Sequence, residues 1–185
     1  EGLYIPGSIF KVIVASSALD NLEDVASNTF DCQGVIQAGS QNISCYGGQS
    51  HGQVDLGQAI TVSCNGYFVD IATKLGKEKL LKTAEAFGFN QDFIFPDLKL
   101  AASRLPLKGH VSKEKLALTS IGQGDVQVTP LHMAMIASAI ANDGIMMEPK
   151  LVYEIAGRNG KTQKTLQPKI YRKPMNKENA EIIQD

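Results

Sequence analysis

Residues 4–11, Tyr-Ile-Pro-Gly-Ser-Ile-Phe-Lys, decide how this chain folds and which chemistry it can carry. They lead into an apolar run from Ile9 to Leu19 that has apolar residues on every side of a helical wheel, which is typical of a buried helix. Pro6-Gly7 marks a turn in front of this run. The sequence therefore predicts a buried helix from about Ser8 to Leu19.

Ser8 and Lys11 lie three residues apart in this segment. Residues at i and i+3 share one helix face, so the two side chains are expected to be neighbours. A buried lysine is unfavourable unless it is paired or uncharged, and desolvation lowers its pKa. Because a neutral lysine can take the proton of a serine hydroxyl, the pattern predicts Ser8 as a nucleophile and Lys11 as its base. The alternative is a Ser-x-x-Lys without function, whose lysine reaches out to water.

A second polar element, Val62-Ser63-Cys64-Asn65, lies between two expected helices. Ser-x-x-Lys followed by Ser-x-Asn makes up two of the three motifs of serine penicillin-recognising enzymes. Further segments fit in order along the chain: His51-Gly52, Gly66-Tyr67-Phe68, Ile121 to Asp125, Val128 to Ala134, and Ala141 to Gly144 with Pro149. From Tyr4 to about Leu151, the chain resembles the transpeptidase domain of penicillin-binding proteins.

The resemblance implies an α+β, mostly helical fold. It would be the helical part of a β-lactamase/transpeptidase-like fold, with small β-hairpins and most of the central sheet missing. The family's third motif is a Lys-Thr-Gly strand, and the nearest string here, Lys161-Thr162-Gln163, lacks the glycine. We therefore expect residues 1–185 to be a single partial transpeptidase domain, cut on both sides from a longer protein and inactive by itself.

The resemblance also implies a function: a serine acyl-transferase (D,D-transpeptidase) that cross-links peptidoglycan stem peptides ending in D-Ala-D-Ala and is trapped by β-lactam antibiotics. Ser8 would form the acyl-serine intermediate, Lys11 would be its base, Ser63 would relay a proton to the departing amine, and Asn65 would hydrogen-bond the substrate. Two alternatives are a β-lactamase and a non-catalytic β-lactam sensor domain. For Ser63 and Asn65, a further alternative is plain helix capping.

Composition and context limit the partners. The net charge is −1 and no basic cluster is present, which excludes a nucleic-acid partner. No cofactor is expected. The resemblance implies that the full-length protein is membrane-anchored and acts on the extracytoplasmic face of the bacterial cell membrane. Because two expected helices are apolar on all sides and lack a covering sheet, we expect the fragment to self-associate.

The cysteines leave three alternatives open. With His51 they form the pattern Cys32-x12-Cys45-x5-His51-x12-Cys64, and zinc accepts such ligands. Short paired spacings such as Cys-x2-Cys are absent, so the zinc pattern is weak and no metal is expected. The extracytoplasmic location implied by the resemblance favours a disulfide between Cys32 and Cys45, with free buried thiols an equal alternative. Cys64 is expected to be a small core residue.

Local signals predict the remaining elements. The expected helices are one capped by Asp55 up to Thr61, one ending at Gly76, one from Lys77 to Phe87 that stops at Gly88, one capped by Ser112 up to Ser120, one from Thr129-Pro130 to Asn142, and one capped by Asn176. The expected hairpins span residues 32–46, centred on Ala38-Gly39, and 151–166, turned at Asn159-Gly160. Residues 89–110 are expected to be irregular, and His132 is expected to be a hydrogen-bonded core histidine.

Overall fold

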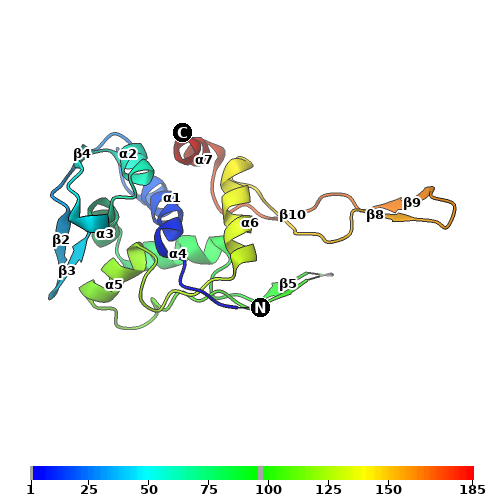
Figure 1. Ribbon diagram of the computed structural model, residues 1–185, viewed down its shortest axis with the longest axis horizontal. Coiled ribbons are helices and arrows are strands. Elements are labelled where there is room, and N and C mark those ends of the chain that lie inside the picture. The colour runs from blue at the N-terminus through cyan, green and yellow to red at the C-terminus, as the bar shows by residue number, and fades with distance from the viewer. Residues whose placement is uncertain (1, 96–97) are drawn as a thin grey trace.

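The computed structural model describes residues 2–95 and 98–185. A bundle of short helices forms the body of the molecule, and a thin β-hairpin projects from one end of it (Figure 1). The α-helices are α1 (Lys11–Asn21), α2 (Leu56–Thr61), α3 (Asn65–Leu75), α4 (Lys77–Phe87), α5 (Lys113–Ser120), α6 (Pro130–Ala141) and α7 (Lys177–Gln184). Two 3-10 segments are η1 (Gly7–Phe10) and η2 (Tyr46–Gly48).

The strands form separate antiparallel two-stranded ladders, and no larger sheet is present among the described residues. The pairs are β1 (Phe30–Cys32) with β4 (Gly52–Val54), β2 (Val35–Ala38) with β3 (Gln41–Ser44), β5 (Phe93–Ile94) with β6 (Lys99–Leu100), β7 (Met146–Met147) with β10 (Ile170–Arg172), and β8 (Glu154–Ala156) with β9 (Thr162–Thr165). The segment 89–110, expected to be irregular, contains the β5–β6 ladder, and its residues 96 and 97 lie outside the described part. The predicted α+β, mostly helical fold with small hairpins is confirmed.

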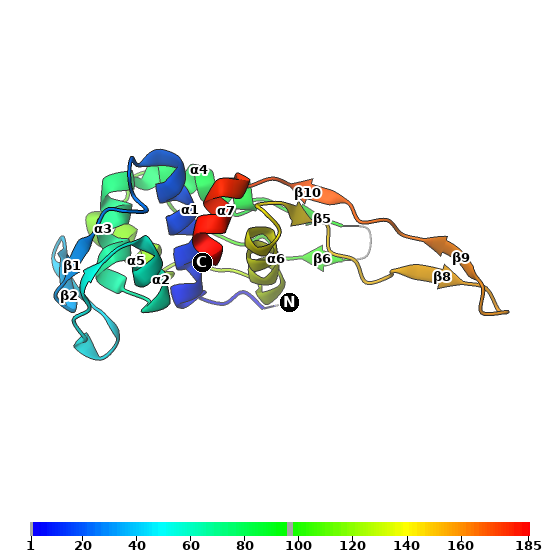
Figure 2. The ribbon, with the colours of Figure 1, turned by 90° about the horizontal axis from the view of Figure 1, so that it is seen from above.

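Helix α1 lies inside the bundle and packs against α3, α4 and α7 (Figures 1 and 2). The helical turn begins at Gly7 as a 3-10 segment and becomes an α-helix only at Lys11. The predicted start at Ser8 is therefore one residue late for the 3-10 turn and three residues early for the α-helix. The predicted burial is confirmed, since Ile13 to Ala18 are all buried.

The predicted helix caps are confirmed. The side chains of Asp55, Ser112, Thr129 and Asn176 each accept a hydrogen bond from the backbone N–H three residues later. Such a bond satisfies one of the N–H groups that a helix start leaves unpaired. α4 ends, as predicted, at Gly88, whose φ of 110° suits glycine.

The β2–β3 hairpin turns at Gly39-Ser40, one residue later than predicted. Cys32 lies outside this hairpin and pairs with Gly52 in the β1–β4 ladder. The expectation that one hairpin spans residues 32–46 is therefore wrong at its start, because Cys32 pairs with Gly52 in a second ladder.

The predicted second hairpin is confirmed as β8–β9. It is the thin hairpin that extends away from the helices (Figure 2), and its strand residues are exposed. Its loop includes Asn159-Gly160, and Gly160 donates a backbone hydrogen bond to Gly157. Lys161-Thr162-Gln163, the string nearest to the family's third motif, lies in this exposed hairpin.

The predicted core histidine is confirmed. His132 on α6 is fully buried, with Nε2 3.0 Å from the Phe87 carbonyl oxygen and Nδ1 2.7 Å from Ser103 Oγ. A neutral ring protonated on Nε2 satisfies both contacts: it donates to the carbonyl and accepts from the Ser103 hydroxyl. Burial lowers the pKa of His132 to about 4, which keeps the ring neutral.

One side of α6 is not covered, as expected for a helix that is apolar all round and lacks part of its covering sheet. Ala134, Ala137 and Ser138 are exposed. An apolar groove of about 470 Å³ runs between α1, α6 and α7, and it is lined by Ile9, Val12, Met133, Ala134, Ala137, Ile140 and Ile183. The exposed face and the groove agree with the expectation that the described residues do not cover this helix completely.

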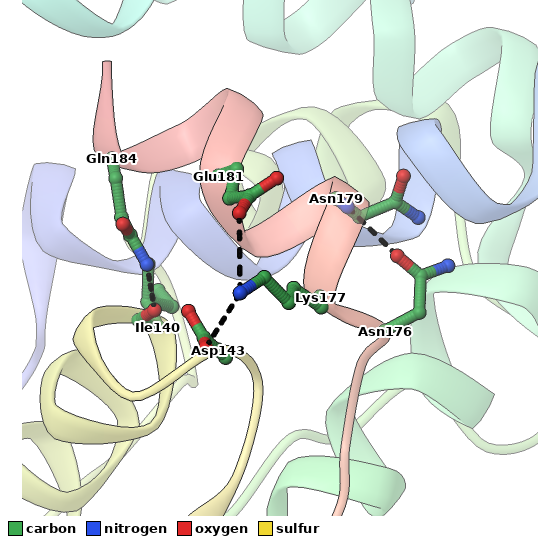
Figure 3. Close-up of polar contacts among 7 residues, drawn as sticks. All are labelled: Ile140, Asp143, Asn176, Lys177, Asn179, Glu181 and Gln184. Atoms are coloured by element: carbon green, nitrogen blue, oxygen red, sulfur yellow. Dashed lines mark hydrogen bonds and ion pairs between the residues drawn. The ribbon is translucent and has the colours of Figure 1, made fainter.

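Helix α7 is anchored at the end of α6 by polar contacts (Figure 3). Lys177 Nζ lies 3.1 Å from Asp143 Oδ2 and 3.5 Å from Glu181 Oε1, and the Gln184 amide donates to the Ile140 carbonyl. Exposed ion pairs stabilise a fold only weakly, so these contacts mainly orient α7 beside the groove. None of the described helices combines the length and the apolar composition that crossing a lipid bilayer requires.

Candidate active site

Lys11, Ser63 and Asn65 meet in the structure, although they come from two distant segments. Lys11 is buried at the start of α1, and Ser63 and Asn65 flank the start of α3. Lys11 Nζ donates to the Ser63 carbonyl oxygen at 2.8 Å, to Ser63 Oγ at 2.9 Å and to Asn65 Oδ1 at 2.6 Å. These three acceptors match the three N–H donors of an ammonium group, so the buried charge is fully hydrogen-bonded.

Burial lowers the pKa of Lys11 to about 8, although the neighbouring Cys45 and Cys64 oppose the shift. With a pKa of about 8, roughly a tenth of the molecules carry a neutral amine at pH 7, against roughly one in three thousand at the ordinary value. The ring of Phe68, whose centroid is 5.6 Å from Nζ, lies against the same group. Lys11 therefore has the environment that a general base needs.

Neither Ser63 nor Asn65 caps α3. The N-cap is Cys64, whose Sγ accepts a hydrogen bond from the Tyr67 backbone N–H. Ser63 precedes it with a left-handed φ of 52°. That conformation costs a non-glycine residue about 1–2 kcal/mol. The capping alternative is therefore wrong, and both polar side chains are available to Lys11.

Ser8 lies on η1, one turn before Lys11, and its side chain is exposed. The segment around Gly122 supports this turn, because the Gly7 backbone N–H donates to the Gly122 carbonyl oxygen at 2.9 Å. A β-bridge between Tyr4 and Val128 holds the residues just before the turn. Ser8 therefore lies exposed on the η1 turn, and Lys11 lies one turn further along, at the buried start of α1.

The supporting role of Gly122 was missed by the sequence reasoning. A side chain at this position would collide with the Gly7 carbonyl oxygen and lie 2.8 Å from Phe10 Cβ. Gly122 also has a φ of 68°, which suits glycine. The only signal in the sequence was the pair of glycines in Gly122-Gln123-Gly124, and it gave no indication of what they touch.

Three cysteines and one histidine gather beside this site. Cys32, Cys45 and Cys64 are buried, His51 is half-buried, and their ligand atoms all lie within 4.8 Å of one another. Cys32 Sγ and Cys45 Sγ are 3.7 Å apart and are not bonded in the structure. The expectation that Cys64 is a small buried residue is confirmed. The disulfide remains a prediction.

Comparison with known proteins gives consistent matches. A family model for the penicillin binding protein transpeptidase domain matches residues 1–185. The chain is 33% identical, over 98% of its length, to the peptidoglycan D,D-transpeptidase PbpA of Mycolicibacterium smegmatis, of which it covers 38%. It is 32% identical, over 82% of its length, to the stage V sporulation protein D of Bacillus subtilis, of which it covers 23%.

Solved structures are similar as well. The D,D-transpeptidase domain of a peptidoglycan glycosyltransferase from Eggerthella lenta matches with a TM-score of 0.88 at 31% identity, covering all of this chain (100%) and 48% of that one. The imipenem acyl-enzyme complex of penicillin-binding protein A from M. tuberculosis matches with a TM-score of 0.83 at 31% identity, covering 98% of this chain and 42% of that one. The chain thus spans between 23% and 48% of the length of these proteins.

Proposed function

The chain belongs to the transpeptidase domain family of penicillin-binding proteins, and from this we propose that the whole protein is a serine D,D-transpeptidase that cross-links peptidoglycan. Ser8 Oγ attacks the carbonyl carbon between the two D-alanines that end a stem peptide. D-alanine leaves with a proton, and an ester remains on Ser8. An amine of a neighbouring stem peptide then attacks the ester, which forms the cross-link and returns the proton to Ser8.

The observation that carries this proposal is the convergence of Lys11 on Ser63 and Asn65 across 52 and 54 residues of sequence. A lysine without function would extend its ammonium into water, whereas this one is buried under a complete set of acceptors. In the neutral form, the amine keeps two N–H donors and gains a lone pair. That lone pair accepts the proton of the Ser8 hydroxyl as the attack begins.

Ser63 and Asn65 have separate parts in the proposed reaction. Ser63 Oγ, 2.9 Å from Lys11 Nζ, passes the proton from the lysine to the departing amine of D-alanine. Asn65 uses Oδ1 to hold Lys11 and one N–H of its amide to hold the Ser44 carbonyl at 2.7 Å. The second N–H of the amide donates to the substrate backbone. The backbone N–H of Ser8, in the first turn of η1, has no acceptor within that turn and stabilises the oxyanion.

The proposal extends to inhibitors, location and assembly. β-Lactams, which mimic the D-alanyl-D-alanine end, acylate Ser8. The whole protein is anchored in the membrane and works on its extracytoplasmic face, where peptidoglycan lies. In the isolated chain, the apolar groove beside Ile9 and Ala137 is covered by a second copy, because burying apolar surface is favourable.

The test uses the full-length protein with a stem pentapeptide and an acceptor amine, followed by mass spectrometry. We expect D-alanine release and a cross-linked product, and both should be lost in Ser8→Ala. A β-lactam should form a long-lived adduct. Rapid turnover of a chromogenic cephalosporin without peptide product would indicate a β-lactamase, and adduct formation without peptide product would indicate a sensor; either result overturns the proposal.

A further inference from the structure

A group of four side chains next to the proposed catalytic residues has no part in the reaction described above. Cys32 ends β1, Cys45 follows β3, His51 precedes β4, and Cys64 caps α3. Cys45 Sγ lies 3.7 Å from Cys32 Sγ and 3.9 Å from Cys64 Sγ, and Cys32 Sγ lies 3.5 Å from His51 Nδ1. Each side chain comes from a different local element, yet all four ligand atoms point to one place.

Three of the six distances among these ligand atoms have the values of a tetrahedral zinc site, and the others are no longer than 4.8 Å. Zinc binds cysteine sulfur at about 2.3 Å and histidine nitrogen at about 2.0–2.1 Å. Two sulfurs bound to one tetrahedral ion then lie about 3.8 Å apart, and a sulfur and a nitrogen about 3.6 Å apart. Three thiolates and an imidazole also form a donor set that favours zinc over hard cations such as Mg²⁺ or Ca²⁺.

We propose that Cys32, Cys45, His51 and Cys64 bind one structural zinc ion. The three thiols bind as thiolates and release their protons, and His51 binds as a neutral imidazole through Nδ1. No redox step is involved. The four protein ligands fill the coordination sphere and leave no open position for water, so the ion is structural rather than catalytic.

The surroundings of the sulfurs support this assignment. The Tyr67 backbone N–H donates to Cys64 Sγ at 3.4 Å, and the His51 backbone N–H donates to the Cys32 carbonyl oxygen at 3.1 Å. Backbone donors aimed at sulfur are the kind of outer contact that orients and stabilises metal thiolates. The pattern differs from that of ordinary buried cysteines, which pack as small apolar residues.

The small local core is consistent with such a ligand. Between α1 and α2, the chain forms only three- and four-residue strands and one 3-10 turn. Between Asn28 and Asp55, the buried apolar residues besides Cys32 and Cys45 are Ala38, Ile43 and Val54. A core this small does not stabilise the order of a segment of this length, and metal binding is one common way in which proteins compensate.

A disulfide explains less of the geometry. A bond between Cys32 and Cys45 requires a sulfur separation of about 2.05 Å, and it would account for two of the four side chains. Cys64 and His51 would then have no reason to lie within 4.8 Å of the pair. The sequence analysis favoured the disulfide over zinc because of the implied extracytoplasmic location. It found the zinc pattern weak because short paired spacings are absent, but the fold brings the four side chains together from distant segments.

The position of Cys64 has a consequence that rests on the proposed function. Cys64 lies between Ser63 and Asn65, whose side chains hold Lys11, and Ser63 has a left-handed backbone. Asn65 also binds the Ser44 carbonyl, directly before Cys45. A zinc ion that binds both Cys45 and Cys64 therefore fixes the two segments that the hydrogen bond between Asn65 and Ser44 joins. The ion acts as a positioning element for the catalytic turn.

The test begins with the metal content of the 185-residue chain, purified under a non-thiol reductant after expression with zinc. Elemental analysis should give about one zinc per chain, and cobalt exchange should give the intense visible bands of tetrahedral thiolate coordination. Cys45→Ser and His51→Gln should each lose the metal. His110→Gln is the matched control, because His110 is exposed and lies outside the group, and it should retain the zinc.

Several outcomes would overturn the proposal. The first is that the wild-type chain takes up neither zinc nor cobalt. The second is that Cys45→Ser and His51→Gln both retain zinc. The third is that the mass of the wild-type chain is two hydrogens lower than the sequence gives and that a peptide with Cys32 linked to Cys45 is found. The last would establish the disulfide instead. If Cys45→Ser does not fold, the cobalt spectrum of the wild type and the His51→Gln variant still decide the question.

The positioning role is measured separately in the full-length protein. Removing zinc with a chelator should lower the rate of β-lactam acylation at least about tenfold, and restoring zinc should recover it. An unchanged rate after metal loss would refute the positioning role while leaving the zinc site intact. Zinc binding without any acylation in either state would refute the proposed function and leave the metal site standing.

Discussion

Replacing Gly122 with alanine should destabilise the fold and displace the turn that carries Ser8. The change has two costs. The φ of 68° is unfavourable for alanine by about 1–2 kcal/mol. In addition, the new Cβ would collide with the Gly7 carbonyl oxygen and lie 2.8 Å from Phe10 Cβ. Overpacking of this kind typically costs about 1–3 kcal/mol more.

Gly124→Ala is the matched control for this prediction. Its φ of 74° imposes the same backbone cost, but a Cβ there would meet Leu118 Cβ at 3.7 Å, an ordinary contact. We therefore expect Gly124→Ala to lose about 1–2 kcal/mol and Gly122→Ala about 2–5 kcal/mol of unfolding free energy. The difference isolates the contact between Gly122 and Gly7.

Urea unfolding of the 185-residue chain, followed by circular dichroism, measures the two free energies. In the full-length protein, β-lactam acylation gives a second measurement, because Gly7 directly precedes Ser8. Acylation should slow markedly in Gly122→Ala and little in Gly124→Ala. Equal losses of stability and equal acylation rates in the two variants would refute the argument that Gly122 supports the turn.

Three further predictions follow from charge and burial. Burial holds the pKa of His132 at about 4, below the ordinary 6.5, so between these pH values the unfolded chain binds a proton that the folded chain excludes. The free energy of unfolding should therefore fall by about 3 kcal/mol from pH 6.5 to 4. His132→Gln should lose this part of the pH dependence. The rate at which a β-lactam acylates the full-length protein should rise with pH through about 8, as Lys11 loses its proton. Lys11→Ala should be acylated about 10²–10⁴-fold more slowly, and Ser63→Ala should lose less. A normal acylation rate in Lys11→Ala would rule out Lys11 as the base. Ala137→Glu in the groove should abolish the self-association of the chain, measured by sedimentation. Ser138→Glu is the control, because Ser138 is exposed on the same helix but lies outside the groove, and it should leave self-association intact. A wild-type chain that is strictly monomeric would contradict the prediction.

Signals that depend on a few neighbouring residues predicted the local structure well. Thr129-Pro130 begins α6 because a hydroxyl cap and a proline both favour the first helical turn. Gly88 ends α4 because glycine accepts the left-handed conformation that closes a helix. In both cases, the physical cause lies within one turn of chain, so the sequence contains it.

The meeting of Lys11 with Ser63 and Asn65 was predicted for a different reason. No local rule brings Lys11 to Ser63, and only the resemblance to a family indicated that they meet. Local reasoning alone favoured capping by Ser63 or Asn65 and did not foresee that Cys64 would take the cap. A polar residue near a helix start has several local uses, and only the tertiary structure selects among them.

Long-range packing accounts for what the sequence did not show. The four side chains Cys32, Cys45, His51 and Cys64 come from separate segments, and a two-strand ladder that pairs Cys32 with Gly52 helps to bring them together. The sequence indicated that the apolar helix α6 lacks part of its cover but not which residues are exposed, because an apolar helix predicts burial without showing which neighbours supply it. Gly122 was missed because its neighbour Gly7 is distant in sequence.

The central claim is that Ser8 is the nucleophile, and mapping of the covalent adduct tests it most directly. The full-length protein would be treated with penicillin, digested and sequenced by tandem mass spectrometry. We predict that the penicilloyl group lies on the peptide containing Ser8 and that Ser8→Ala forms no adduct, whereas Ser63→Ala still forms one, more slowly. An adduct on another residue, or labelling that survives in Ser8→Ala, would contradict the account.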